Sequence, residues 1–447
     1  MADKAASGLT SVMQSMAGRI LFVLINAATG IVTARALHPS GRGELAALGV
    51  WPNFLGSAMT FGLPSALVFW SRSEPGQKSN FVWASLPITV LMGSVAVLLG
   101  MIGIPFWLSQ YPPHIIHVAQ LLMLNAFIVL FTLNARAACE AGNDFFASSL
   151  ALCMMPFFAL VALVTVYLNH SLTPVTAVLC YVGAGLPSCI FLVFRVRHSF
   201  TQRPTHVLLA ARKLLSYGSR SYGVDICGTL SLYADQAVVV HLLDPGAMGI
   251  YVVALSLSRT LNVIHQAVAA VLFPKAVSLQ QADLIAMTGR ATRISTLCTS
   301  TCGALVALLG PGLLSLLYGR EYRDATMILN ILIAEVILTG ATLVLTRAYM
   351  ALNRPGLVTV LQSSGLLLSL PLLAVFVPRW GVLGASFALL TAAVVRLAVA
   401  LASFRFVLGQ PAPGLIPRID ELQIMARRLR NAGSNALRRR AAEVAGV

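Results

Sequence analysis

Five charged residues lie inside long apolar stretches of this sequence. They are Asp225, Asp235, Arg259, Glu335 and Arg396. A charge at the centre of a bilayer costs about 2.5–3.5 kcal/mol on insertion scales, so such residues usually face a bundle interior or a water-filled cavity. The two arginines could hold an anionic group such as a pyrophosphate, and the three carboxylates are candidates for coupling to Na⁺ or H⁺. In the alternative, opposite charges such as Arg259 and Asp235 neutralise each other as structural pairs.

Uncharged polar residues extend this candidate site. At roughly 100° per residue, Arg259, Asn262 and Gln266 fall on one face of a predicted helix. Two asparagines, Asn26 and Asn53, add polar positions in the first half of the chain. The candidate substrate-binding residues of a hydrophilic cavity are therefore Arg259, Arg396, Asn262, Gln266, Asn26 and Asn53.

The composition indicates a membrane protein. Hydrophobic residues make up 57% of the chain and charged residues 10%, and the mean hydropathy is +0.82, whereas soluble domains are roughly a quarter charged. Such a chain cannot cover itself with polar surface, so a bilayer must be its solvent. The net charge of +16 could suggest a nucleic-acid partner. Because the basic residues flank the apolar stretches or lie in one tail, we expect membrane lipids as partners and no nucleic acid.

The seven cysteines show no CxxC or Cys/His metal spacing. We therefore expect no metal and no other cofactor beyond a coupled ion.

Twelve apolar stretches are long enough for transmembrane helices, which need about 20 residues each. Their approximate ranges are 14–37, 44–70, 80–108, 115–138, 145–168, 173–197, 216–241, 246–273, 291–317, 325–348, 356–378 and 381–408. With the N-terminus in the cytoplasm, most Lys and Arg residues outside these stretches fall on the cytoplasmic side, as the positive-inside rule requires. The exceptions are Arg35, Arg42, Arg320, Arg323 and Arg379. The pattern predicts an all-α multi-pass membrane protein with cytoplasmic N- and C-termini.

An internal repeat divides the twelve predicted helices into two sets of six. Pro39 and Gly43 in the first half correspond to Pro245 and Gly249 in the second. Two further pairs follow at similar offsets, Leu63–Ala66 with Phe273–Ala276 and Arg136 with Arg347. Since six is even, the repeat predicts two six-helix bundles related by a pseudo-two-fold axis along the membrane normal, with a cavity between them.

The repeat also predicts the division of the chain. The segments are an N-terminal six-helix bundle (1–198), a cytoplasmic linker (199–215), a C-terminal six-helix bundle (216–408) and a basic cytoplasmic tail (409–447). In the tail, apolar residues alternate with arginines, which is typical of an amphipathic helix on the inner leaflet. A solvated tail that only reinforces the topology is the equal alternative.

Short motifs in both halves resemble a known family. Thr33–Glu44 followed by Phe61–Ala66 resembles the first hairpin of bacterial polysaccharide transporters, the lipid-linked oligosaccharide flippases of the multidrug/oligosaccharidyl-lipid/polysaccharide exporter superfamily. Asp244–Pro245 and Gly249–Tyr251 resemble the seventh-to-eighth helix region of the same group. The chain departs from the pattern at His38, where the family usually carries glycine.

The resemblance implies a function. It is the movement of undecaprenyl-pyrophosphate-linked sugar repeat units from the inner to the outer leaflet of a bacterial cytoplasmic membrane. A polysaccharide polymerase and glycosyltransferases would be the partners. The sugar needs a hydrated cavity and the pyrophosphate needs cations, while the polyprenyl tail can stay in lipid as the bundles alternate between two states.

Two other function classes remain open. An ion-coupled multidrug or metabolite antiporter of the same superfamily would share the helices and the carboxylates, although Arg259 and Arg396 favour an anionic cargo. A membrane enzyme would need a catalytic loop or domain, and the sequence has no sizeable outer loop and no GxxxxGK[ST] motif. We therefore expect no enzyme. Under the flippase hypothesis, Arg259→Ala or Arg396→Ala should abolish export while leaving membrane insertion intact.

Overall fold

The computed structural model describes residues 2–200, 205–276, 280–352 and 354–414, and the regular elements in these ranges are all helical. The longer helices are α1 (Ala2–Ala58), α2 (Leu63–Ser73), α3 (Lys78–Trp107), α4 (Pro113–Leu122), α5 (Asn125–Ala141), α6 (Phe145–Leu168), α7 (Pro174–Phe200), α8 (Val207–Leu242), α9 (Pro245–Arg259), α10 (Asn262–Ala276), α11 (Gln281–Leu313), α12 (Thr326–Ala351) and α13 (Pro355–Leu408). Three short helices, η1 (Pro75–Gln77), η2 (Leu314–Tyr318) and η3 (Arg320–Ala325), connect them. Of the predicted basic tail, only the first residues, 409–414, lie within the described ranges.

Within these ranges, nine helical stretches are long and apolar enough to cross a membrane. The prediction of an all-α multi-pass membrane protein is therefore confirmed. Two of the stretches, Ile20–Ser73 and Gly356–Leu408, are more than twice as long as one crossing requires. Each contains a residue with positive φ that breaks the helical conformation, His38 (φ 57°) in α1 and Gly381 (φ 56°) in α13. Helix α8 is not one of the nine.

Three of the predicted spans are interrupted in the structure. The predicted helix 44–70 is divided between Ala58 and Leu63, where Phe61 and Gly62 have positive φ. The predicted helix 115–138 is divided at Met123 and Leu124 into α4 and α5, and the predicted helix 246–273 is divided between Arg259 and Asn262 into α9 and α10. The divided turns keep local hydrogen bonds, such as Leu261 N to Ser258 O at 3.1 Å. Short 3₁₀-type hydrogen bonds of this kind satisfy the backbone groups at an interruption. Neither of the last two breaks contains a proline or glycine, so the sequence did not reveal them.

The segment predicted as a cytoplasmic linker, 199–215, is helical over most of its length. Helix α8 begins at Val207, and its first turns bury Ala210 and Leu214 against Leu67 and Phe81 of the first half. The Lys213 ammonium also binds the Glu74 carboxylate at 2.6 Å. Because this stretch is rich in basic residues, the sequence indicated a linker and did not reveal the amphipathic helix that packs on α2 and α3.

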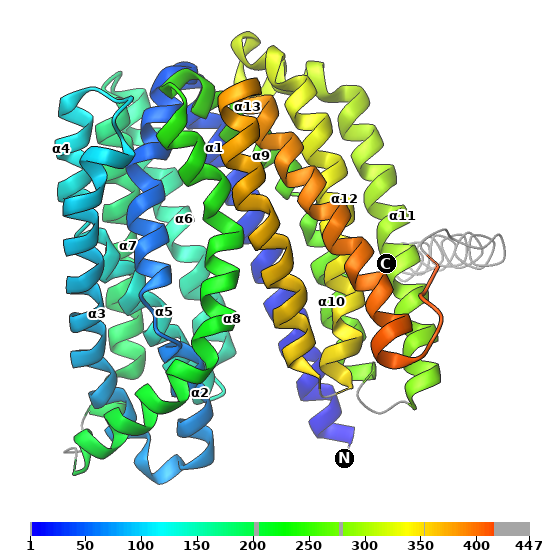
Figure 1. The fold of residues 1–447 in the computed structure, drawn as a ribbon. Helices are drawn as coiled ribbons and strands as arrows, with labels where there is room; N and C mark the ends of the chain where they lie inside the picture. Colours follow the sequence, from blue (N-terminus) through cyan, green and yellow to red (C-terminus); the bar gives the residue numbers. More distant parts are fainter. Residues whose placement is uncertain (1, 201–204, 277–279, 353, 415–447) are drawn as a thin grey trace, which may run out of the picture.

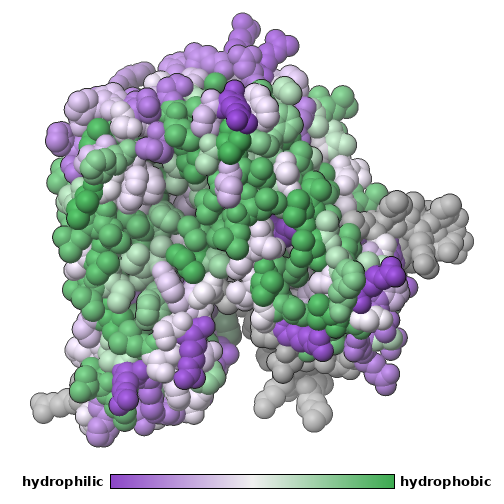
Figure 2. All heavy atoms as spheres, in the orientation of Figure 1, coloured by the Kyte–Doolittle hydropathy of each residue, from purple (hydrophilic) through white to green (hydrophobic). Residues whose placement is uncertain are grey.

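The helices form two lobes that meet at one end of the molecule. In Figure 1, α2 to α7 lie in one lobe and α9 to α13 in the other, and the lobes diverge towards the lower end of the view. The space-filling view in Figure 2 shows a hollow between them at that end, below a broad hydrophobic band. Hydrophilic side chains gather at the upper and lower ends, as expected for a molecule whose middle band faces lipid.

The two lobes are sealed at the upper end by the repeated Pro–Gly turns. A Cβ atom on Gly43 would lie 1.7 Å from the Pro245 carbonyl oxygen, and one on Gly249 would lie 1.9 Å from the Pro39 carbonyl oxygen. Only glycine permits backbones to approach this closely. The contact is reciprocal, because each turn receives the other in the same way.

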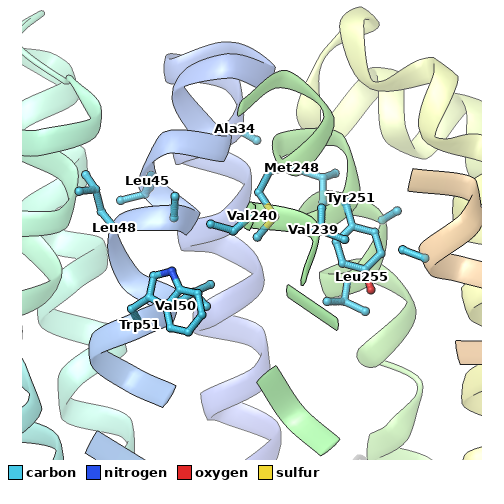
Figure 3. Packing of buried hydrophobic residues seen from close by; sticks show 14 of the residues in the cluster. Ala34, Leu45, Leu48, Val50, Trp51, Val239, Val240, Met248, Tyr251 and Leu255 are labelled. Atoms are coloured by element: carbon cyan, nitrogen blue, oxygen red, sulfur yellow. The ribbon is translucent and has the colours of Figure 1, made fainter. Parts of the chain in front are cut away.

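Apolar side chains continue this seam towards the membrane centre. Figure 3 shows Val240, Met248 and Tyr251 of α8 and α9 in one cluster with residues of α1 that include Leu45 and Trp51. At the upper end, the Tyr322 hydroxyl donates a hydrogen bond to the Ala34 carbonyl at 3.2 Å. The seam therefore closes the upper end of the molecule while the lower end stays open.

Candidate functional site

A cavity of about 360 Å³ lies on the inner face of the first lobe, against α8 and α9. Its polar lining comes from Asn26, Asn53, Asn125, Arg42 and Gln236, which belong to α1, α5 and α8. Two tyrosines and a set of aliphatic side chains complete the wall, and they are Tyr181, Tyr233, Leu45, Leu48, Val50, Leu122, Val178, Val182 and Val252. Ligand cavities in proteins commonly combine apolar walls with a few polar groups of this kind.

The turn at Pro39 brings the two predicted asparagines together. Because α1 reverses direction after His38, its two arms run side by side and present Asn26 and Asn53 to the same cavity. Each side-chain NH₂ donates to a carbonyl one turn earlier in its own helix, from Asn26 to Phe22 at 2.8 Å and from Asn53 to Gly49 at 2.7 Å. In the described part of the chain no group donates to either amide oxygen, so both can accept hydrogen bonds from hydroxyl groups in the cavity.

Two further amides reach the cavity because of local breaks and helix register. The interruption at Met123 and Leu124 places Asn125 at the start of α5, beside the cavity. On α8, Tyr233 and Gln236 face the cavity. Asp235, between them in sequence, faces α9 instead, where it contacts Tyr251.

Arg42 is a cavity residue that the sequence analysis placed in an outer connection. It lines the cavity, and its Nε is buried without a hydrogen-bond partner among the described residues. The signal that could have found it is the repeat. Arg42 precedes Gly43 as Met248 precedes Gly249, and Met248 is fully buried.

The charged residues of the second half form a separate network. The Arg259 guanidinium lies 3.2 Å from the Asp235 carboxylate, which is only 2% exposed and also accepts a 2.7 Å hydrogen bond from the Tyr251 hydroxyl. The second Asp235 oxygen, Oδ1, is buried and has no partner in the described part of the chain. The structural pair between Arg259 and Asp235, which the sequence left as an alternative, is therefore present.

Glu335 and Arg396 extend the network across α12 and α13. The Arg396 guanidinium donates to the Thr339 hydroxyl at 2.6 Å, and that hydroxyl donates to the Glu335 carboxylate at 2.5 Å. Glu335 also interacts electrostatically with Arg259. Two carboxylates thus balance two guanidinium groups, and the network as a whole carries no net charge.

The remaining predicted residues are Asp225, Asn262 and Gln266. Asp225 is ten residues before Asp235 on the continuous helix α8, a rise of about 15 Å. Asn262 begins α10 and is half-buried, and Gln266 is exposed. Thr260 and Leu261 interrupt the helix between Arg259 and Asn262, so the predicted polar stripe is divided between α9 and α10.

The fold defines the class of protein. It is similar to the solved structure of the lipid II flippase MurJ in its inward closed conformation, with a TM-score of 0.75, 14% identity, and coverage of 94% of this chain and 91% of that chain. It is also similar to a multidrug resistance MATE transporter of the MOP superfamily. The TM-score is 0.70 for the inward-facing form, at 15% identity over 87% of this chain and 96% of the other. The chain therefore has the fold that these MOP-superfamily structures share.

The sequence identifies the family within that class. Residues 32–327 match the family of polysaccharide biosynthesis proteins, and the chain belongs to it. The chain is also similar to the probable low-salt glycan biosynthesis flippase Agl15 of Haloferax volcanii, with 25% identity over 182 residues. That alignment covers 40% of this chain and 39% of the relative. The chain is thus a multi-pass membrane protein of a polysaccharide biosynthesis family, and this family agrees with the resemblance found in its turn motifs.

Proposed function

We propose that this protein flips a polyprenyl-pyrophosphate-linked oligosaccharide across a bacterial cytoplasmic membrane for polysaccharide export. The observation that carries the proposal is the cavity of the first lobe. Its amides offer hydrogen bonds to sugar hydroxyls, and its two tyrosine rings, Tyr181 and Tyr233, offer flat apolar faces. Membership of a polysaccharide biosynthesis family and the similarity to a probable glycan flippase support the same substrate class.

The proposed architecture is twelve spans in two bundles of six, 1–198 and 216–408, related by a pseudo-two-fold axis along the membrane normal. The reciprocal packing of Gly43 on Pro245 and Gly249 on Pro39 supports such an axis, because a two-fold axis makes equivalent residues exchange equivalent contacts. The division of α1 at His38 and of α13 at Gly381, together with α8, supports the number twelve.

The proposed orientation places the open, lower end of Figure 1 in the cytoplasm together with both termini. Basic residues of that end include Arg72, Arg195 and Lys213, which agrees with the positive-inside rule. In this orientation the hollow of Figure 2 faces the cytoplasmic side, where glycosyltransferases build the lipid-linked substrate. A polysaccharide polymerase on the opposite side would use the product.

In the proposed cycle the polar head enters the hollow and rests against the amides of the first lobe while the polyprenyl tail remains in lipid. Separation of the Pro–Gly turns at the upper end and closure of the lower end would then expose the head to the outside. Rocking of two bundles around a central site is the general mechanism of such repeat-built transporters. The head can shift the populations of the two states only by as much as its affinities for them differ.

The second lobe supplies the proposed ion coupling. Asp225, Asp235 and Glu335 remain the candidates for Na⁺ or H⁺ binding. If an ion neutralises a carboxylate of the network, Arg259 or Arg396 would become available to bind the anionic substrate. Of these three carboxylates, Asp235 forms an ion pair with Arg259 and Glu335 accepts a hydrogen bond from Thr339, whereas the described residues give the Asp225 carboxylate neither. If Asp225 binds the ion, Asp225→Asn should remove the dependence of transport on the Na⁺ or H⁺ gradient while substrate binding persists.

The antiporter alternative predicts a different cavity. Cationic drugs are held by carboxylates and aromatic rings. The lining that the structure describes contains Arg42 and several amides but no Asp or Glu. Two assays separate the alternatives, drug efflux by inverted vesicles and restoration of polysaccharide export in a flippase-null strain. Drug efflux without restored export would favour the antiporter instead.

Reconstituted transport tests the proposal directly. The double variant Asn26→Ala/Asn53→Ala removes two amides from the cavity, whereas Asn169→Ala removes an exposed asparagine at the end of α6. We expect the double variant to lower the translocation rate of a labelled lipid-linked oligosaccharide in proteoliposomes by at least about tenfold, since several hydrogen bonds of roughly 1 kcal/mol each are lost. Equal rates for the double variant and the Asn169 control would contradict the proposal.

A further inference from the structure

Arg42 is a charge that the fold has placed in the cavity without a counter-charge. Among the described residues it forms no ion pair, and the cavity lining contains no carboxylate. Its Nε is shielded from solvent with no hydrogen-bond partner. A buried donor left unsatisfied costs about 1–3 kcal/mol, and the half-buried Arg42 guanidinium would gain a partner from an anionic group in the cavity.

The fold itself does not require a charge at this position. In the second half of the repeat the equivalent residue is Met248, which is fully buried in the seam. Both residues directly precede the glycine of the reciprocal contact, Gly43 or Gly249. An apolar side chain is therefore compatible with the turn, and the arginine is a feature of the first-half cavity alone.

Arg42 lies at the end of the cavity that is farther from the cytoplasmic hollow. It follows the Pro39 turn at the sealed end, and it interacts electrostatically with Tyr318 and Tyr322 of the second lobe. Asn53 is eleven residues further along the same arm of α1, a rise of about 16 Å. The polar lining between them consists of neutral amides and tyrosines.

This arrangement fits a long substrate whose two ends differ in charge. If the polyprenyl tail stays in the inner leaflet, the pyrophosphate is held near the cytoplasmic end and the sugars extend towards Arg42. Resting on the proposed flippase function, we infer that Arg42 binds an anionic substituent on the glycan itself, such as a uronic acid carboxylate. The substrate class is then an acidic oligosaccharide. A guanidinium fork matches a carboxylate with two parallel hydrogen bonds.

A matched pair of ligands tests the inference. Both are short-chain prenyl-pyrophosphate-linked tetrasaccharides, one with a single uronic acid and one neutral, so the pyrophosphate is common to both. We expect the purified protein to bind the acidic ligand at least about tenfold more tightly than the neutral one, because a hydrogen bond to a charged group contributes roughly 1.5–3 kcal/mol. Arg42→Met should abolish this preference, because it should lower the affinity for the acidic ligand at least about tenfold more than the affinity for the neutral one.

Two control variants sharpen the result. Arg379→Met removes an exposed arginine assigned to the same side of the membrane and should retain the full preference for the acidic ligand. Arg42→Lys keeps the charge and loses the fork, so it should retain only part of the preference. Unchanged thermal unfolding of Arg42→Met would show that the variant is folded, as Met248 in the other half leads us to expect.

The possible outcomes separate this inference from the proposed function. Equal affinities of the wild-type protein for the two ligands would overturn the acidic-glycan inference and leave the flippase proposal standing. An equal loss of affinity for both ligands in Arg42→Met would also overturn it, because Arg42 would then bind the pyrophosphate that they share. Binding of neither ligand to the wild-type protein would overturn both proposals.

Discussion

The two lobes handle polar groups inside the membrane in opposite ways. The first lobe leaves a cavity of about 360 Å³ lined by amides and by Arg42. The second lobe fills the corresponding region with a neutral network in which Asp235 binds Arg259 and Glu335 is linked through Thr339 to Arg396. The first half of the repeat thus presents hydrogen-bonding groups to a cavity, whereas the charged groups of the second half pair with one another.

The difference shows how a duplicated fold can divide its tasks. The halves still share the Pro–Gly turn, and the reciprocal contact of Gly43 and Gly249 depends on that symmetry. The halves differ in the environment of the residue that precedes the turn glycine. In the first half Arg42 follows it into a cavity, and in the second half Met248 follows it into the apolar seam. We interpret the first lobe as the substrate-binding half and the second as the half that stabilises and couples the conformational states.

Disrupting the reciprocal contact of Gly43 and Gly249 should have the largest effect on transport. In Gly43→Ala the new Cβ would meet a backbone carbonyl oxygen at 1.7 Å, and because backbone cannot move aside cheaply the two turns must separate. We expect loss of transport and faster hydrogen exchange of the amides in 39–45 and 245–251. Gly30→Ala is the matched control, since a Cβ at Gly30 meets nothing within 4 Å. A Gly43→Ala protein with normal transport and normal exchange would refute the seam as the closing contact.

Breaking the second-half network should have a smaller effect, on stability first. Arg259→Ala leaves the Asp235 carboxylate buried with one remaining donor, Tyr251. Removing one partner of a buried pair costs about 3–5 kcal/mol, and the 29% exposure of the Arg259 side chain reduces our expectation to roughly 2 kcal/mol. Thermal unfolding in detergent should therefore shift downward.

The double variant Asp235→Asn/Arg259→Ala decides between a structural pair and a binding role. We expect it to recover most of the stability lost in Arg259→Ala, because no uncompensated charge remains. If Arg259 instead binds substrate and has no structural part, the single variant will unfold at the wild-type temperature and still fail to transport. That result would restore Arg259 to the anion-binding role that the sequence suggested.

The exposed pair at the sealed end should matter least. His38 Nδ1 lies 2.9 Å from the Glu321 carboxylate, but the side chains are 68% and 54% exposed. Exposed pairs of this kind contribute about 0–1 kcal/mol. Glu321→Gln should therefore leave the translocation rate within about twofold of the wild type. A loss as large as that of Gly43→Ala would mean that this pair, and not the glycine contact, holds the lobes together.

The sequence predicted the all-α, membrane-spanning character well, because the apolar length of the stretches determines it almost alone. It also predicted Asn26 and Asn53 as cavity residues, and the structure brings them to one wall through the turn at Pro39. It did not predict the interruptions at Met123 and at Thr260, where neither proline nor glycine marks the break. For the same reason it joined Arg259 to Asn262 and Gln266 in a stripe that the structure divides.

Arg42 was missed for a different reason. Its neighbours Ser40, Gly41 and Gly43 are turn residues, so the local sequence indicates an exposed loop. Its half-buried environment arises from packing of the two lobes, which joins residues roughly 200 positions apart in the chain. Only the comparison with Met248 at the equivalent position of the repeat could have indicated a partly buried site.

The central claim is that the polar head of a lipid-linked glycan rests in the first-lobe cavity, and site-specific photo-crosslinking tests it most directly. A photoreactive residue replaces Asn53 in the cavity in one protein and Leu98, which is 61% exposed on the apolar surface, in another. With a radiolabelled lipid-linked oligosaccharide, we predict labelling through the glycan at position 53, competed by unlabelled substrate, and no such glycan labelling at position 98. Absence of glycan labelling at position 53, or equal labelling at both positions, would contradict the account.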